Sequence, residues 1–200
     1  MTKIKLCGLS RPCDIKAANQ LMPEYIGFVF APKSKRHVSS EQAAELKRLL
    51  APEIKAVGVF VNETPEGIAS LLNSGVIDLA QLHGDEDETY IRQLRTFSDR
   101  PIIKAFRAGT AKDIAEAACS TADYILLDSG AGTGTVFDWG LLRKFSRPYF
   151  LAGGLGAGNV EQAIKTLRPF AVDVSSGIET NGVKDKEKMA AFVAAVRKNW

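Results

Sequence analysis

Two glycine-bearing turns near the C-terminal end of the chain have the composition of a phosphate site. They are Ala152-Gly153-Gly154-Leu155-Gly156 and Val174-Ser175-Ser176-Gly177-Ile178, and each follows a short apolar run. Glycine lets the backbone approach an anion closely. The N–H groups at a helix start then point at the anion with the positive end of the helix dipole. We therefore predict phosphate binding at Gly153, Gly154, Ser176 and Gly177.

A thiol and a carboxylate each stand at the end of an apolar run that suits a strand. Cys7 precedes Gly8, and Asp128 follows Tyr124-Ile125-Leu126-Leu127. A cysteine with a lowered pKa can act as a base or nucleophile, although free cysteine also fills cores as a small hydrophobe. An unpaired buried carboxylate is costly. Asp128 therefore suits a general acid or base, or a cap for the loop that follows it.

Polar residues near other strand ends are further candidates. Arg36 lies in a basic loop. Arginine can hold a carboxylate with two hydrogen bonds, so Arg36 either binds such a group or belongs to a solvated run of surface charges. Asp173 interrupts an apolar run, so it either faces a ligand hydroxyl or pairs with a lysine. Gln81 and His83 end another run, where the histidine faces substrate or caps a loop. The only other histidine is His37, at no metal-ligand spacing, so we predict no metal site.

These residues would be positioned by eight short apolar runs that alternate with helical patterns. Several runs are nearly continuous in Val, Ile, Leu and Phe, as in parallel strands covered on both faces. The predicted strands are Ile4–Cys7, Tyr25–Phe30, Ala56–Val61, Leu79–Leu82, Ile102–Phe106, Tyr124–Asp128, Tyr149–Ala152 and Ala171–Val174. The predicted helices are Pro12–Leu21, Ser40–Leu50, Pro65–Asn73, Glu86–Phe97, Ala111–Ala118, Asp138–Lys144, Asn159–Leu167 and Asp185–Lys198.

Eight such units allow a closed barrel or a doubly wound open sheet. Phosphate-type turns after the seventh and eighth runs favour the barrel, whereas a nucleotide-binding open sheet carries its glycine-rich turn after the first strand. We therefore predict an α/β fold, a single (βα)8 TIM barrel with eight parallel strands spanning residues 1–200. The glycine-rich loop Ser129–Thr135 matches neither the dinucleotide nor the P-loop pattern. We expect it to close over a site.

Composition narrows the partners and the compartment. The net charge is +3, and the 26 basic residues are spread along the chain rather than clustered, which argues against nucleic acid. Cys7, Cys13 and Cys119 stand at irregular spacing, which favours a reducing compartment over a disulfide framework. We expect Cys13 and Cys119 to pack in their helices. Without a signal-peptide pattern or a long apolar segment, we expect a cytoplasmic protein with no membrane partner. Because no loop shows an exposed apolar surface, we expect a monomer.

Taken together, the motifs resemble those of one family, phosphoribosylanthranilate isomerase of tryptophan biosynthesis. The resemblance spans nearly the whole chain, in the right order. It rests on Lys5-Leu6-Cys7-Gly8-Leu9-Ser10-Arg11, Gln81-Leu82-His83-Gly84-Asp85-Glu86, Leu127-Asp128-Ser129, Leu151-Ala152-Gly153-Gly154-Leu155 and Val172-Asp173-Val174-Ser175-Ser176-Gly177-Ile178-Glu179. Leu6 and Ser10 depart from it, since isoleucine and threonine are more usual there, and both changes are conservative.

The resemblance implies a barrel enzyme that isomerises N-(5-phosphoribosyl)anthranilate by an Amadori rearrangement without a metal or an organic cofactor. It implies that Cys7 is the general base and Asp128 the general acid, each contributing about 10²–10⁴-fold. It places Arg36 on the anthranilate carboxylate and Asp173 near the reacting sugar. With Gln81 and His83, these complete the predicted substrate-binding set.

Three alternatives share the phosphate turns. Indole-glycerol-phosphate synthase would show catalytic lysine and glutamate at strand ends and a longer N-terminal extension. The aminoimidazole-carboxamide ribotide isomerase has an aspartate where Cys7 stands. A phosphosugar sensor without activity would keep the turns but need neither Cys7 nor Asp128. The cysteine and the aspartate together therefore favour the isomerase.

Overall fold

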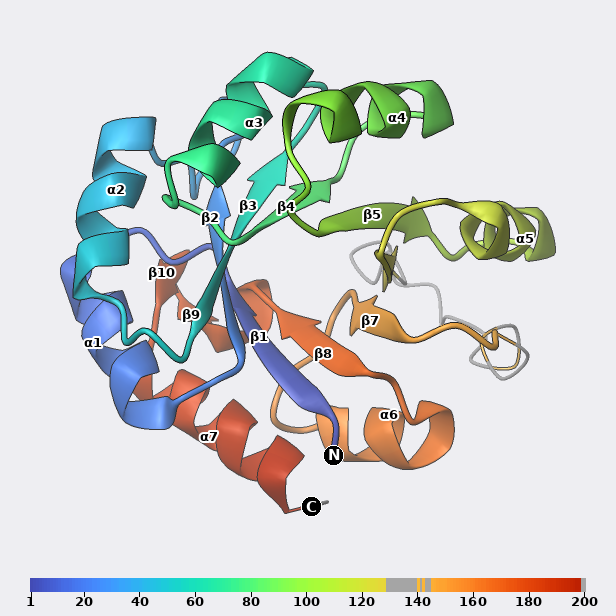
Figure 1. Cartoon of the computed structure of the whole chain (residues 1–200). Helices are drawn as coiled ribbons and strands as arrows, with labels where there is room; N and C mark the ends of the chain where they lie inside the picture. The colour runs from blue at the N-terminus through green and yellow to red at the C-terminus, as the bar shows by residue number, and fades with distance from the viewer. Residues whose placement is uncertain (129–139, 141, 143–144, 199–200) are drawn as a thin grey trace.

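The computed structural model describes residues 1–128, 140, 142 and 145–198. Its eight parallel strands form a closed barrel in sequence order, with β1 paired to β8 (Figure 1). The strands are β1 (Lys3–Cys7), β2 (Tyr25–Val29), β3 (Lys55–Phe60), β4 (Leu79–Leu82), β5 (Ile102–Arg107), β6 (Tyr124–Asp128), β7 (Tyr149–Ala152) and β8 (Ala171–Val174). The predicted barrel is confirmed, and every strand bound lies within one residue of its prediction.

Helices surround the barrel on its outer face (Figure 1). Within the described residues they are α1 (Pro12–Leu21), α2 (Ser40–Leu49), α3 (Pro65–Asn73), α4 (Glu88–Phe97), α5 (Ala111–Cys119), α6 (Val160–Leu167) and α7 (Lys186–Arg197). Ser39 and Thr64 cap α2 and α3, as their sequence positions indicate. The predicted helix Asp138–Lys144 falls mostly on residues outside the described part, and the loop Ser129–Thr135 lies wholly outside it.

The prediction that a helix begins at Glu86 is wrong by two residues. Asp87 caps α4 by accepting a hydrogen bond from the Tyr90 N–H. The Glu86 carboxylate instead accepts bonds from the N–H groups of Asn62 and Gly84, which places it in the preceding loop. Side-chain bonding to the backbone therefore sets the helix start later than the acidic run suggests.

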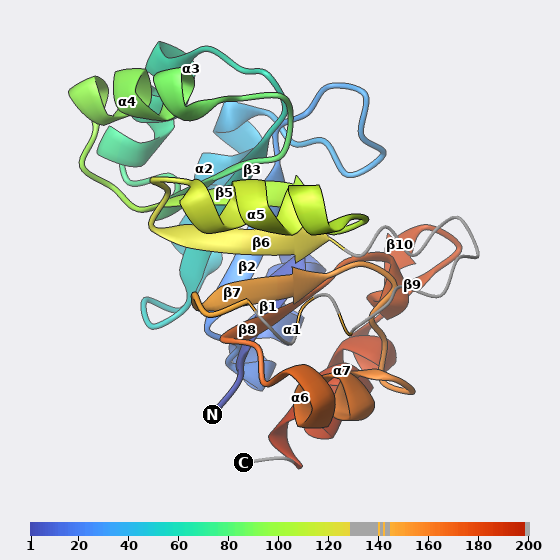
Figure 2. The same ribbon diagram turned by 90° about the vertical axis from the view of Figure 1, so that its right-hand side faces the viewer.

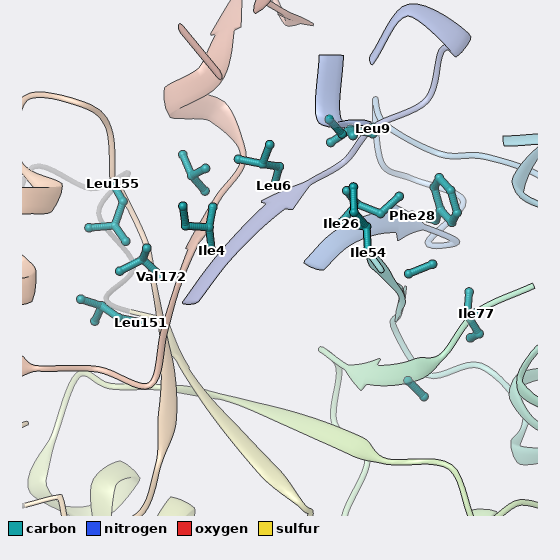
Figure 3. Close-up of a cluster of buried hydrophobic side chains, with 14 of the residues drawn as sticks. Ile4, Leu6, Leu9, Ile26, Phe28, Ile54, Ile77, Leu151, Leu155 and Val172 are labelled. Carbon is teal, nitrogen blue, oxygen red and sulfur yellow. The ribbon is translucent and has the colours of Figure 1, made fainter. Parts of the chain in front are cut away.

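The side chains of β1 alternate between two environments, as strand geometry requires. Ile4 and Leu6 lie on the same side of the strand, in the apolar layer that also contains Val172 (Figure 3). Lys5 is completely buried, and Cys7 is 7% exposed inside the barrel. The interior of the barrel therefore receives the side chains of Lys5 and Cys7.

An aromatic cluster fills the N-terminal end of the barrel. Phe150 packs against Tyr25, Tyr124 and Phe170, with ring centroids 5.4, 5.9 and 5.6 Å away. These rings come from strand starts or, for Phe170, from the residue before β8. The reactive residues consequently collect at the opposite, C-terminal ends of the strands.

A small hairpin that was not among the predicted elements lies at this C-terminal end (Figure 2). It pairs β9 (Glu179–Thr180) with β10 (Val183–Lys184) in antiparallel register. Its two-residue turn places Asn181 at φ 54° and Gly182 at φ 78°. An Asn-Gly pair is a strong hairpin signal in a sequence, so this element could have been predicted.

The expectation that Cys13 and Cys119 pack in their helices is wrong, because both are exposed. The buried face of α1 comprises Asp14, Ile15, Ala17 and Ala18, which leaves Cys13 outside it.

None of the helices in the described part of the chain is both long enough and apolar enough to span a membrane.

Candidate active site

A cavity of about 350 Å³ opens at the C-terminal ends of the strands. Pockets for small ligands usually enclose ~300–1,000 Å³. Nine of the ten residues predicted from the sequence line this cavity: Cys7, Arg36, Gln81, His83, Asp128, Gly153, Gly154, Asp173 and Ser176. Closure of the barrel thus brings residues from the whole length of the chain around one space.

Cys7 contributes its sulfur from the end of β1. A Cβ at Gly27 on the neighbouring strand would lie 2.6 Å from Cys7 Sγ, so glycine there leaves room for the sulfur. Burial raises the pKa of the Cys7 thiol above its ordinary value, although the positive charges of Lys5 and Lys184 oppose the rise. The lowered pKa that the sequence argument required is therefore not found, and the thiol form is favoured at neutral pH.

Asp128 faces the same cavity from the end of β6. Strands β1 and β6 are not neighbours in the barrel, so the cavity separates Cys7 from Asp128. Asp128 Oδ2 lies 3.7 Å from His83 Nε2, and the two side chains are 31% and 36% exposed. An acid and a base can therefore reach a substrate from different strands of the barrel.

Beneath these groups lies a buried polar cluster. Lys5 Nζ donates to both carboxylate oxygens of Asp173 at 3.1 Å and to Gln81 Oε1 at 2.8 Å. Burial acts to lower the pKa of Lys5, but the carboxylate of Asp173 outweighs it and the pKa is raised. Of the two readings of Asp173, pairing with a lysine is the one observed. Asp173 also lines the cavity, so the pair forms part of its floor.

Arg36 is held by the unpredicted hairpin. Its Nε and Nη2 donate to the two Glu179 oxygens at 2.6 and 2.9 Å. Lys184 Nζ donates to the same carboxylate at 2.6 Å and to the Ser175 carbonyl at 2.9 Å. Burial opposes ionisation of Glu179, yet the hydrogen bonds from Arg36 and Lys184 prevail and lower its pKa to about 2. Arg36 is therefore fixed in the cavity wall rather than solvated.

The two glycine turns meet where β7 and β8 end. Gly153 and Gly154 adopt φ values of 98° and 61°, which glycine tolerates best. A Cβ at Gly177 would lie 2.0 Å from the Leu155 carbonyl oxygen, so only glycine allows the turns to approach this closely. Gly177 itself is absent from the residues that line the cavity. Gly177 therefore lies where the two turns contact each other.

Comparison with known proteins agrees with this geometry. The family model described as N-(5'phosphoribosyl)anthranilate (PRA) isomerase matches residues 4–195. The chain belongs to this family. The N-(5'-phosphoribosyl)anthranilate isomerase of Endomicrobium trichonymphae is 45% identical to it over 202 residues, covering 98% of this chain and 99% of the relative.

Solved structures of the family superpose closely on the barrel. The phosphoribosyl anthranilate isomerase of Thermotoga maritima is 36% identical with a TM-score of 0.90, covering 99% of this chain and 100% of its own. A phosphoribosyl anthranilate isomerase in complex with reduced 1-(o-carboxyphenylamino)-1-deoxyribulose 5-phosphate is 36% identical, with a TM-score of 0.88 and the same coverage.

Three charged residues of this isomerase-family site were not identified as functional from the sequence. Lys5 could have been found, because it alternates with Ile4 and Leu6 and so shares a face with Cys7. Glu179 and Lys184 had no such signal, since their role depends on contacts with Arg36 and Ser175 across the fold.

Among the described residues, no group of three or more His, Cys, Asp or Glu side chains could hold a metal ion.

Proposed function

We propose that this protein isomerises N-(5'-phosphoribosyl)anthranilate, with Cys7 as general base and Asp128 as general acid. One observation carries the proposal of an acid and base pair. Both side chains line the same cavity, but they come from strands that are not adjacent in the barrel. A substrate between them would meet an acid on one side and a base on the other. The rearrangement requires this arrangement around one ribose.

Two proton transfers of the proposed reaction fall to Asp128 and Cys7. Asp128 gives its proton to the ring oxygen, the bond from that oxygen to the anomeric carbon breaks, and a protonated Schiff base forms. The Cys7 thiolate then removes the proton from the neighbouring sugar carbon. The electron pair of that C–H bond becomes the C=C bond of the enol, while the C=N π pair moves to nitrogen. In the final tautomerisation the former anomeric carbon gains a proton and the enol oxygen loses one, which yields the 1-amino-1-deoxyketose. Each transfer can contribute about 10²–10⁴-fold.

The two ends of the substrate would be held by different parts of the barrel. The turns containing Gly153, Gly154 and Ser176 suit the phosphate. Arg36 suits the anthranilate carboxylate, because Glu179 accepts from Nε and Nη2 and guanidinium has further N–H groups on Nη1 and Nη2. Anchors at opposite ends would orient the ribose between the acid and the base.

Replacing either reactive group tests the proposal. We expect Cys7→Ala and Asp128→Ala each to lower kcat at least a hundredfold, because each removes one proton-transfer group. The assay follows the loss of fluorescence of freshly prepared phosphoribosylanthranilate. Unchanged circular dichroism and melting temperature would show that the variants fold. Near-normal turnover in either folded variant would remove that residue from the mechanism.

We also propose that the isomerase is cytoplasmic and monomeric. The support for the compartment is that Cys7, Cys13 and Cys119 are free thiols. Light scattering coupled to size-exclusion chromatography tests the second part, and a mass near twice 21.6 kDa would contradict it.

A further inference from the structure

A continuous line of polar side chains crosses the cavity floor toward Asp128. Lys5 Nζ donates to Gln81 Oε1 at 2.8 Å, and Gln81 Nε2 lies 2.8 Å from His83 Nδ1. His83 Nε2 then lies 3.7 Å from Asp128 Oδ2. We name Lys5, Gln81 and His83 the relay. It runs from β1 to the end of β4, and its last member, His83, lies near Asp128 of β6.

The chemistry of the relay fixes the direction of each hydrogen bond. A lysine ammonium can only donate, so the Gln81 atom that faces it must be the carbonyl oxygen. The other end of the amide is then the NH₂ group, which can only donate to His83 Nδ1. A nitrogen that accepts a hydrogen bond carries no proton, so the neutral ring carries its proton on Nε2. That N–H is the one nearest Asp128.

Burial prevents the Gln81 side-chain amide from turning over, so each hydrogen bond of the relay keeps its direction. Lys5 is completely buried and Gln81 is 1% exposed, so water does not compete for their polar atoms. Turning the amide over would place NH₂ against the ammonium and leave a buried donor without an acceptor, which is strongly unfavourable. Asp173 adds to the constraint, because it holds Lys5 Nζ through both carboxylate oxygens.

We propose that Lys5 and Gln81 are positioning residues that hold His83 as the Nε2–H tautomer, and that this N–H stabilises the Asp128 carboxylate formed when Asp128 gives up its proton. This inference rests on the acid role proposed above for Asp128. The histidine gains and loses no proton in the step. Asp128 and His83 are each about one-third exposed, which leaves them room to close the 3.7 Å gap. Catalytic hydrogen bonds commonly tighten when substrate binds.

The tautomer can be measured directly because the chain has only two histidines. His37→Gln removes the other one, whose side chain is exposed in a loop, and leaves a single imidazole for ¹⁵N NMR. We expect the neutral ring to carry its proton on Nε2, with Nδ1 unprotonated. Gln81→Glu should transfer the proton to Nδ1, because a carboxylate accepts where the amide donated. Gln81→Met should give a mixture of tautomers.

Kinetics provide the second readout. We expect Gln81→Glu, which removes the proton from Nε2, to lower kcat about ten- to a hundredfold, the effect of losing a hydrogen bond to a charged group. Gln81→Met, which keeps part of the Nε2–H tautomer, should lower kcat less, and KM should change less than threefold in both variants. A proton on Nδ1 in the His37→Gln protein, one tautomer in all three proteins, or unchanged kcat in Gln81→Glu would overturn the relay. Asp128→Ala with normal turnover would instead overturn the proposed function, so the two failures are distinguishable.

Discussion

At the scale of single residues, the Cys7 thiol has a raised pKa where a reactive cysteine more often has a lowered one. The cause is burial, which Lys5 and Lys184 offset only in part. A base that takes a proton from carbon gains strength as its pKa rises, while its ionised fraction at neutral pH falls. The surrounding charges therefore set a compromise between the strength of the base and the amount of thiolate.

This compromise predicts that Cys7 ionises only in alkaline solution. Because its pKa is raised, the thiolate fraction should still be increasing above the ordinary thiol value of about 8.5. The ultraviolet absorbance of the thiolate, followed against pH in the wild type and in Cys7→Ser, isolates this titration, because Cys13 and Cys119 are present in both proteins. Complete ionisation of Cys7 at neutral pH would contradict the raised pKa.

At the scale of elements, the β9–β10 hairpin determines where Arg36 lies. Its two strands place Glu179 opposite Lys184 in register, and both side chains are at most 7% exposed. Lys184 also donates to the turn after β8. The hairpin thus links the predicted carboxylate site to the predicted phosphate site.

The hairpin predicts a selective binding defect. Glu179→Gln removes the charge that holds Arg36, so we expect KM for the substrate to rise about three- to thirtyfold, with kcat changed less. The reason is that a charge-assisted hydrogen bond is about twice as strong as a neutral one. Steady-state kinetics measure both constants. Arg36→Met provides the reference, and a Glu179→Gln enzyme with wild-type KM would separate the hairpin from substrate binding.

Glu179 also predicts acid sensitivity. Its pKa is about 2 in the folded protein and about 4.3 in an unfolded chain. A lowered folded pKa stabilises above the unfolded value, and that stabilisation is lost as pH falls from about 4.3 to 2. We expect a contribution of about 1–3 kcal/mol at neutral pH once solvent screening is allowed for. Urea unfolding of the wild type and Glu179→Gln should differ at pH 7 and converge near pH 2.

At the scale of the whole molecule, the barrel separates stability from chemistry. The aromatic cluster around Phe150 occupies the N-terminal end, and the cavity occupies the C-terminal end. Loops at the C-terminal end carry function in barrels of this type. Changes to the aromatic cluster should therefore affect folding more than catalysis.

The Phe150→Ala substitution tests this separation. Phe150 is fully buried, and removing its ring should cost about 3–5 kcal/mol. The melting temperature should fall by roughly 6–20 °C, while kcat/KM measured well below the transition stays within twofold. Phe97→Ala is a matched control, because Phe97 is 42% exposed and its loss should change little. A large loss of activity in folded Phe150→Ala would show that the two ends are coupled.

Much of this organisation was contained in local sequence. Strand positions could be predicted to within one residue because parallel strands buried on both faces have a distinctive apolar pattern. Helix starts were predicted less closely, as at Glu86, because side chains compete for the same backbone N–H groups. The hairpin was missed although Asn181-Gly182 signals it.

The sequence by itself determined the barrel, the positions of Cys7 and Asp128 and the glycines of the two turns. Each of these follows from local pattern, and the order of the motifs indicates the family. Only the tertiary structure decided that Asp173 pairs with Lys5, 168 residues away, and that Glu179 holds Arg36 across 143 residues. It also decided that Lys5 donates to Gln81, the contact on which the proposed tautomer of His83 rests. The physical reason is that charge and hydrogen-bond partners depend on which side chains barrel closure brings within about 3 Å, and spacing along the chain does not specify that.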